Sequence, residues 1–426
     1  MTQKPIPSSA GGFAIHLRCL PFLVLLLGAV ITFQCPGLHA ADPSRSVPRT
    51  WQDTVTSARG QMVYFHAWGG EQRNNDYLQW VAGQVQSLYQ IELQHVKIRD
   101  TASAVSRVLA EKQAGNTLNG AIDLLWINGE NFASMRDNNL LYGPWAEQLP
   151  NFTLVNAPQY PEMRHDFSVP VEGYEAPWLR AHLVFYYDSA YLSAPPRSMR
   201  ELLAWAIANP GEFTYPRPPD FLGSTFLKQA LIELTRDPDT LQQPVSQSNF
   251  DAITAPLWQF LDDLHPKLLR QGRAFPANAP EMRRLLADGE TLLAFSFNPN
   301  DPVNRVRQGE LPESIRSYTM RSGTLANVSF VAIPFNATHK AAAQVVANFL
   351  LSPEAQLRAQ DPDHLGSSSV LDTSLLNRTQ QDAFRALAQK HPSALPESEQ
   401  GNTLQEPHPD WMPALESAWM RRYGVN

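Results

Sequence analysis

Aromatic, glycine and polar residues follow two short apolar segments of the chain, where their types suit contact with a ligand. The first segment, residues 62–65, is followed by Trp68, Gly69 and Gly70. The second segment, residues 122–127, is followed by Asn128, Glu130 and Asn131. Glycine lets a ligand approach the backbone, tryptophan stacks on a ring or a cation, and amides with a carboxylate suit a polar or cationic group. Both sets also fit structural roles: a tight turn with its indole on the surface, and a solvated loop that caps a helix.

Ser224 and Thr225 are a second kind of candidate, because they stand where a helix is expected to open. They follow residues 221–223, and the apolar residues of the helical repeat come next. A helix start offers free backbone N–H groups, so a hydroxyl there suits a carboxylate or a phosphate. An ordinary N-cap explains the same residues equally well, and both roles are compatible.

Four further candidates lie near an expected crossing between two halves of the chain. Tyr174 and Trp178 belong to an aromatic, proline-rich segment, residues 143–180, and either line a cleft or pack in a core. Asn298 and Asn300 follow an apolar segment, residues 291–297, and are candidates for the far wall of such a cleft.

Catalytic motifs are absent from the sequence. It contains no G-x-x-x-x-G-K-[ST], no G-x-G-x-x-G, no H-E-x-x-H and no G-x-S-x-G. The 11 histidines are scattered, with no pair at metal-ligand spacing beside a third ligand. We therefore expect no enzyme activity, no cofactor and no metal site.

Residues 1–40 have the parts of a cleavable secretory signal peptide in the right order. A weakly basic start precedes the apolar run 20–33, and small residues then permit cleavage after Ala40 or Ala41. The run is shorter than the roughly 20 apolar residues that span a membrane, so we expect a cleaved signal and a periplasmic protein. Both cysteines, Cys19 and Cys35, lie inside the signal. The exported chain therefore has no disulfide, thiolate metal site or cysteine nucleophile.

The composition bounds the remaining possibilities. Hydrophobic residues make up 43% of the chain and charged residues 18%, which indicates a globular protein with enough length for two domains. The net charge of −7 argues against nucleic acid or an anionic membrane as the main partner.

Strands and helices are expected to alternate along the chain. In the first part, the apolar patterns predict strands and helices at residues 62–65, 78–88, 91–98, 105–115 and 122–127. In the second part, they predict elements at residues 183–187, 199–208, 213–215, from Ser224 onward, 291–297, 329–334 and 341–351. This alternation predicts an α/β lobe with a largely parallel sheet, followed by a second α/β lobe.

The order of these elements resembles that of the substrate-binding proteins of bacterial ABC importers. The segments that carry the resemblance are 63–70, 121–129, 140–142, 185–188, 195–203, 286–290, 330–334 and 341–356. The most specific is Phe-Val-Ala-Ile-Pro at residues 330–334 with the helix that follows it. Within that class, the chain is similar to a subgroup related to thiamine- and iron-type binding proteins.

The resemblance implies a two-lobed, type II periplasmic-binding-protein fold that traps its ligand in a cleft by hinge closure. It implies that the closed form docks on an inner-membrane permease, and we expect a monomer. Residues 60–180 should lie mainly in lobe 1 and residues 181–300 mainly in lobe 2. Residues 301–426 should form the hinge return and C-terminal helices of both lobes.

The identity of the ligand stays open at this point. A thiamine-like cation suits the aromatic residues and Glu130, a phosphate suits Ser224, and a polyamine, a sugar or a carboxylate also fits. Two other classes compete with the binding protein, an exported two-lobed hydrolase and an envelope interaction protein. An aligned nucleophile and base in the cleft would indicate the first, and a shallow apolar cleft the second.

Overall fold

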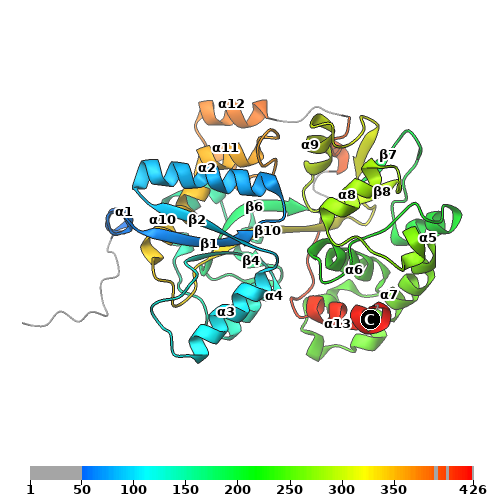
Figure 1. The fold of residues 1–426 in the computed structure, drawn as a ribbon, viewed down its shortest axis with the longest axis horizontal. Coiled ribbons are helices and arrows are strands. Elements are labelled where there is room, and N and C mark those ends of the chain that lie inside the picture. The colour runs from blue at the N-terminus through cyan, green and yellow to red at the C-terminus, as the bar shows by residue number, and fades with distance from the viewer. Residues whose placement is uncertain (1–49, 388–391, 400–402, 425–426) are drawn as a thin grey trace, which may run out of the picture. The chain divides into compact units, whose positions relative to one another are not determined.

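Two separate hydrophobic cores organise the part of the chain that the computed structural model describes, residues 50–387, 392–399 and 403–424 (Figure 1). Both cores belong to one unit, Pro48–Asn426. The parts built around the first and second core are called lobe 1 and lobe 2 below. The predicted signal peptide, residues 1–40, lies outside the described residues.

Lobe 1 contains a six-stranded sheet in which the first three strands are parallel. β1 (Met62–Trp68) pairs with β2 (Glu92–Ile98) and with β3 (Leu124–Ile127), since α2 (Gln72–Tyr89) and α3 (Thr101–Gln113) return the chain between them. β3 also pairs antiparallel with β10, which in turn contacts two further strands. These three are β6 (Glu175–His182), β10 (Thr324–Ala332) and β11 (Thr403–Leu404).

Helices cover this sheet and complete the first core, with α2 and α3 on opposite sides of β1 and β2 (Figure 1). In α2 the predicted apolar repeat is buried at Leu78, Val81 and Val85, whereas Leu88 is 49% exposed. The other helices of lobe 1 are α1 (Trp51–Ala58), α4 (Glu130–Asp137), α10 (Lys340–Leu350), α11 (Pro353–Gln360) and α12 (Arg378–Ala386). The short strands β4 (His165–Asp166) and β5 (Val169–Pro170) pair with each other.

Lobe 2 contains a three-stranded antiparallel sheet with β7 in the middle. Its strands are β7 (Val184–Asp188), β8 (Leu293–Ser296) and β9 (Ile315–Tyr318). Its helices are α5 (Met199–Ala208), α6 (Phe221–Leu234), α7 (Phe250–Leu264), α8 (Ala279–Ala287), α9 (Asp301–Arg307) and α13 (Trp411–Tyr423). The second core is rich in aromatic rings, and α6 lies within it with residues 222–232 all buried.

Two of the crossings between the lobes are antiparallel strands. In the first crossing, Leu179 packs in the first core and Leu183 in the second. In the second crossing, Leu325 packs in the second core and Val328 in the first. β6 and β10 are hydrogen-bonded neighbours over this stretch, so one two-stranded ribbon joins the lobes.

The structure confirms most predicted elements and corrects two local details. The helix at residues 199–208 has the predicted bounds, because its apolar repeat and its Ser198 cap are both local signals. Residues 213–215 are buried but belong to no strand within the described residues. The helix predicted at residues 78–88 begins earlier, at Gln72, with Glu71 at its N-cap position and not Asn75 or Asp76, which the sequence pattern also offered as caps.

Candidate ligand-binding site

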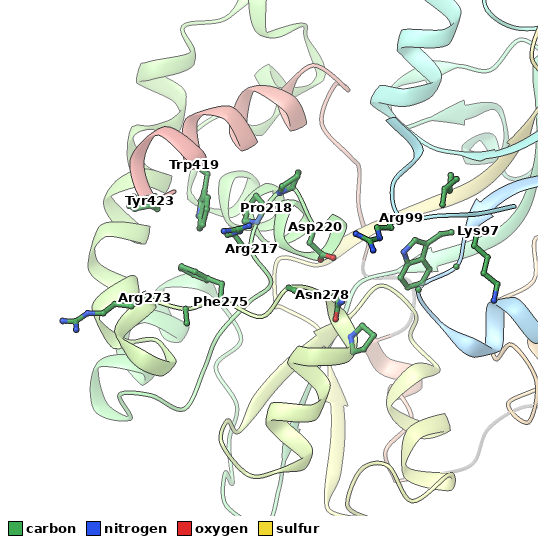
Figure 2. A pocket seen from close by; sticks show the side chains of 18 residues that line it. Lys97, Arg99, Arg217, Pro218, Asp220, Arg273, Phe275, Asn278, Trp419 and Tyr423 are labelled. Carbon is green, nitrogen blue, oxygen red and sulfur yellow. The ribbon is translucent and has the colours of Figure 1, made fainter. Parts of the chain in front are cut away.

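A cavity of about 1040 Å³ lies between the two lobes (Figure 2). The wall from lobe 1 consists of residues 68–70 after β1 and residues 97–99 at the end of β2. The wall from lobe 2 consists of residues 217–220 before α6, part of the segment 273–280 before α8, and two residues of α13. Both strand ends belong to one edge of a parallel sheet, which is where open α/β sheets bind ligands.

The pairing of β1 with β2 positions the lobe 1 wall. Trp68 stands opposite Ile98 in the parallel register, and the Gly69 N–H donates to the Ile98 carbonyl at 3.1 Å. Gly70 permits a close approach of the Trp68 indole, because a Cβ at residue 70 would lie 2.4 Å from that ring. At residue 69 a Cβ would lie 2.7 Å from the side chain of Lys97. The small residues therefore hold the indole and the lysine close to the backbone at the cavity wall.

The cavity wall carries more cations than anions. Lys97, Arg99, Arg217 and Arg273 are exposed and make no ion pair with any residue of the described chain. Asp220 is the N-cap of α6: its carboxylate accepts from the backbone N–H groups of the next turn, and burial raises its pKa to about 6. Figure 2 shows Asp220 and Arg99 extending toward each other from opposite walls.

A buried charged cluster continues inward from the cavity along one face of α6. Asp220, Ser224 and Lys228 are spaced four residues apart, so they lie one above another on that face. The Ser224 hydroxyl donates to Glu416 at 2.5 Å. The Lys228 ammonium donates to Glu406 at 2.7 Å, and both side chains of this ion pair are 1% exposed.

Lobe 1 contributes three carboxyl groups to the same cluster, those of Glu130, Asp166 and Glu175. The Gly129 N–H donates to Asp166 at 2.7 Å. Burial raises the pKa of Glu130 to about 7, against the opposing effect of Lys228. Burial also holds the pKa values of Asp166 and Glu175 well above their usual range, and Glu130 adds to the effect on Asp166.

A second charged contact joins the lobes at Glu71, the residue that begins α2. Its carboxylate accepts from Arg283 of α8 at 3.1 Å and from Arg305 of α9 at 2.9 Å. Both arginines also pair with Asp301 and Glu310, which belong to lobe 2. The structure is therefore a closed arrangement, with one carboxylate of lobe 1 held by two arginines of lobe 2.

Several predicted site residues are placed around the cavity or the cluster. Trp68, Gly69 and Gly70 line the cavity. Glu130 joins the buried cluster, and the Asn131 amide donates to its carboxylate at 2.7 Å. Their contact with a ligand stays a prediction.

Other predicted site residues make structural contacts. The Asn128 amide donates to the Val328 carbonyl at 2.7 Å and so ties a loop to β10. Trp178 is 1% exposed and packs in the first core, and Tyr174 packs against that core. The Asn298 amide donates to the Gly366 carbonyl at 3.0 Å, and its oxygen accepts from the Asn300 N–H at 2.9 Å.

The prediction that Ser224 and Thr225 open a helix with free N–H groups is wrong. α6 begins three residues earlier, at Phe221, because Asp220 caps it. The Ser224 N–H therefore donates within the helix, to the Asp220 carbonyl at 2.9 Å, and the Thr225 hydroxyl donates to the Phe221 carbonyl at 2.8 Å. An anion would find no free donor at these two positions.

Most residues of the cavity wall were not predicted from the sequence. Lys97 and Arg99 end a parallel strand, so the reasoning applied to the first and third strands would have selected them as well. Asp220 follows two prolines and precedes an apolar helical repeat, which is an N-cap signal. No local signal identifies Trp419 and Tyr423, because only tertiary packing brings α13 to the cavity.

The solved structures that this fold matches are two-lobed periplasmic binding proteins. AfuA of Actinobacillus pleuropneumoniae aligns with a TM-score of 0.60 at 15% identity over 86% of this chain and 99% of AfuA. PotD of Streptococcus pneumoniae aligns at 0.56 and 16% over 85% and 98% of the two chains. The ferric binding protein of Campylobacter jejuni aligns at 0.55 and 14% over 75% and 90%. The predicted fold class is confirmed.

Sequence comparison identifies the family. The profile of the bacterial extracellular solute-binding protein family matches residues 80–372. Protein YnjB of Escherichia coli strain K12 is 45% identical over 401 residues, which are 94% of this chain and 98% of YnjB. The chain belongs to the bacterial extracellular solute-binding protein family.

Membership confirms the predicted function class, the substrate-binding component of an ABC importer, and implies a periplasmic location. This family and fold are those of transport binding proteins, and neither a hydrolase nor an envelope interaction protein is favoured. Across residues 50–387, 392–399 and 403–424, no three His, Cys, Asp or Glu side chains are grouped to hold a metal ion. No helix in the same ranges combines the length and the hydropathy that crossing a membrane requires.

Proposed function

We propose that the protein captures one small polar solute in the cavity between its lobes and delivers it to an inner-membrane permease. The cavity of about 1040 Å³ carries this proposal, because both lobes supply its walls. Its volume is at the upper end of the roughly 300–1,000 Å³ of ligand pockets. Movement about the β6–β10 ribbon would open and close it, so that the solute enters the open form and the permease receives the closed one.

The proposal includes the route of export and the division of the chain. Residues 1–40 direct secretion and are removed after Ala40 or Ala41, which N-terminal sequencing of the periplasmic protein tests. Residues 60–180 and 181–300 supply most of lobes 1 and 2, and residues 301–426 return to both. The working protein is a monomer, without a catalytic group.

The similar proteins bind solutes of different charge, so the fold alone does not select the ligand. AfuA was solved with fructose-6-phosphate, PotD is a spermidine/putrescine binding protein, and the Campylobacter jejuni protein binds ferric iron. A thiamine-like cation, a polyamine and a sugar all remain within the proposal. The charged groups of this chain must determine which of these solutes it binds.

Ligand-induced stabilisation tests the proposal. The mature protein is purified without denaturant, its bound small molecules are identified by mass spectrometry, and vitamins, amines, sugars and sugar phosphates are screened by thermal shift. A solute at 100 times its Kd adds about 2.7 kcal/mol to the free energy of unfolding, which raises Tm by a few degrees. The solute should be recovered chemically unchanged.

Two matched variants place the binding event in the cavity. Trp68→Ala removes an aromatic wall and should weaken binding at least several-fold. Tyr191→Ala removes an aromatic side chain that is 77% exposed in lobe 2 outside the cavity, and should leave binding unchanged. Absence of stabilisation by every solute, or equal effects of the two variants, would contradict the proposal.

A further inference from the structure

Five carboxyl groups gather where the lobes meet, beside the ammonium group of Lys228. They belong to Glu130, Asp166, Glu175, Glu406 and Glu416. Glu406 is neutralised by its ion pair with Lys228, whose ammonium also lies 4.4 Å from the ring centre of Phe167 in lobe 1. Burial raises the pKa values of the other four carboxyl groups, so each of them either keeps a proton or needs a cation beside it.

Two of these carboxyl groups lack the hydrogen-bond partners that buried oxygens normally have. Within the described chain, neither oxygen of Glu175 has a partner, and Oδ1 of Asp166 has none. Both side chains are 0% exposed. Buried polar atoms are almost always hydrogen-bonded, since leaving one unpaired costs about 1–3 kcal/mol. The cluster therefore has acceptors to offer and few donors within the protein.

The cluster is connected to the cavity through α6. Asp220 lies in the cavity wall, Ser224 stands one turn further in and holds Glu416, and Lys228 stands two turns in and holds Glu406. One helical turn advances about 5.4 Å. The α6 residues that hold Glu416 and Glu406 therefore lie one and two helical turns from Asp220.

We propose that this carboxyl cluster binds a protonated amine of the transported solute, and that the protein is a receptor for an organic cation. An ammonium group donates three hydrogen bonds and cancels charge that buried carboxylates repel. The inference rests on the proposed function, since it names the chemical class of the solute that the same cleft captures.

The basic side chains of the outer cavity do not oppose this assignment. Lys97, Arg99, Arg217 and Arg273 are exposed, so water and salt screen their charges within about 8–10 Å. The carboxyl cluster is buried, where screening is weaker and unpaired charge is more costly. Selectivity for charge is therefore set at the buried cluster.

Binding of an amine should displace protons from the carboxyl groups, so its affinity should depend on pH. Glu130 faces Asp166 in lobe 1 and Lys228, Glu406 and Glu416 in lobe 2, and its pKa of about 7 means that it is about half protonated at neutral pH. An ammonium ion binds the carboxylate form, so affinity should rise with pH through the range around 7 in which Glu130 loses its proton. At pH 6 most of the population must first lose a proton, and affinity should fall by about tenfold.

Calorimetry on the mature protein tests the inference with putrescine, spermidine and thiamine as cationic probes. Glucose and fructose-6-phosphate serve as neutral and anionic probes. We expect at least one cation to bind, neither sugar to bind comparably, and proton release at pH 7 when titrations are repeated in buffers of different ionisation enthalpy. Tight binding of a sugar with no response to any cation overturns the inference and leaves the proposed function standing. No binding by any solute overturns both.

Charge-removing variants locate the amine. Glu130→Gln should lower affinity for the cation at least tenfold and flatten its pH dependence, and Glu416→Gln should also weaken binding. Glu92→Gln removes one negative charge from an exposed position on β2 of lobe 1 and should change neither. Equal affinities and equal pH profiles for the wild-type protein and Glu130→Gln would overturn the assignment. If Glu130→Gln does not fold, proton release by the wild-type protein still decides the question.

Discussion

Replacement of Glu71 by glutamine should weaken ligand binding without touching the cavity. Glu71 belongs to lobe 1, and its two oxygens accept from Arg283 and Arg305 of lobe 2 at 3.1 and 2.9 Å. Both contacts join the two lobes, so movement of the lobes apart would break them. The substitution removes the charge, so it should destabilise the closed form and leave the open form unaffected.

The size of the effect follows from the burial of the three side chains. Hydrogen bonds to charged groups contribute about 1.5–3 kcal/mol each. Glu71 is 18% exposed, and both arginines keep Asp301 and Glu310 as partners, so part of this is lost to screening and part is compensated. A net change of about 2 kcal/mol in the closing equilibrium is reasonable, which corresponds to a roughly thirtyfold rise in Kd.

Two measurements check this prediction, calorimetric affinity and the radius of gyration of the ligand-saturated protein by X-ray scattering. Glu310→Gln is the matched control, because Glu310 pairs with the same two arginines from within lobe 2. It should leave affinity within about threefold of the wild-type value. The reasoning is refuted if Glu71→Gln binds as tightly as the wild-type protein, or if the two variants lose affinity equally.

Three further predictions concern stability. Lys228→Met leaves Glu406 buried without its partner and should lower the free energy of unfolding in urea by about 3–5 kcal/mol. Gly129→Ala should cost about 1–3 kcal/mol in the same assay, because residue 129 has a φ of 55° and its new Cβ would lie 2.5 Å from the ring of Phe167. Burial lowers the pKa of His265 to about 4, so the unfolded chain gains a proton between pH 6.5 and 4 that the folded protein does not. The stability of the wild-type protein relative to His265→Gln should therefore fall by about 3 kcal/mol from pH 7 to pH 4, measured by urea unfolding at each pH.

The sequence predicts the elements whose signals are local. Helix 199–208 has an apolar repeat and a serine cap within a dozen residues, and β1 opens with the apolar run 62–65 and is followed by glycine. The strand β6 has no such signal, because its residues include Glu175, Pro177 and Arg180. It is a strand because it pairs with β10, about 150 positions further along the chain. Patterns within a window of ten or fifteen residues cannot contain that information.

The same distinction separates the two walls of the cavity. The lobe 1 wall follows from a rule about strand ends, and Trp68, Gly69 and Gly70 lie on it. The lobe 2 wall and the buried cluster depend on contacts between distant segments, such as Lys228 with Glu406. Ser224 was predicted as a site residue because a helix start was expected there. The structure instead places it beside Glu416 through a contact between two distant segments of the chain.

Some electrostatic interactions favour closure of the lobes and others oppose it. A solute that weakens the opposing interactions shifts the equilibrium toward the closed form. The pairs of Glu71 with Arg283 and Arg305 favour the closed form. The approach of Glu130 to the carboxyl groups of lobe 2 opposes it, since each must lose charge or find a cation. A cationic solute would reduce the repulsion between the carboxyl groups and leave the Glu71 ion pairs intact. Its binding free energy would therefore stabilise the closed form. On this argument, a lower pH should also favour closure of the empty protein, because protonation of Glu130 relieves the same repulsion.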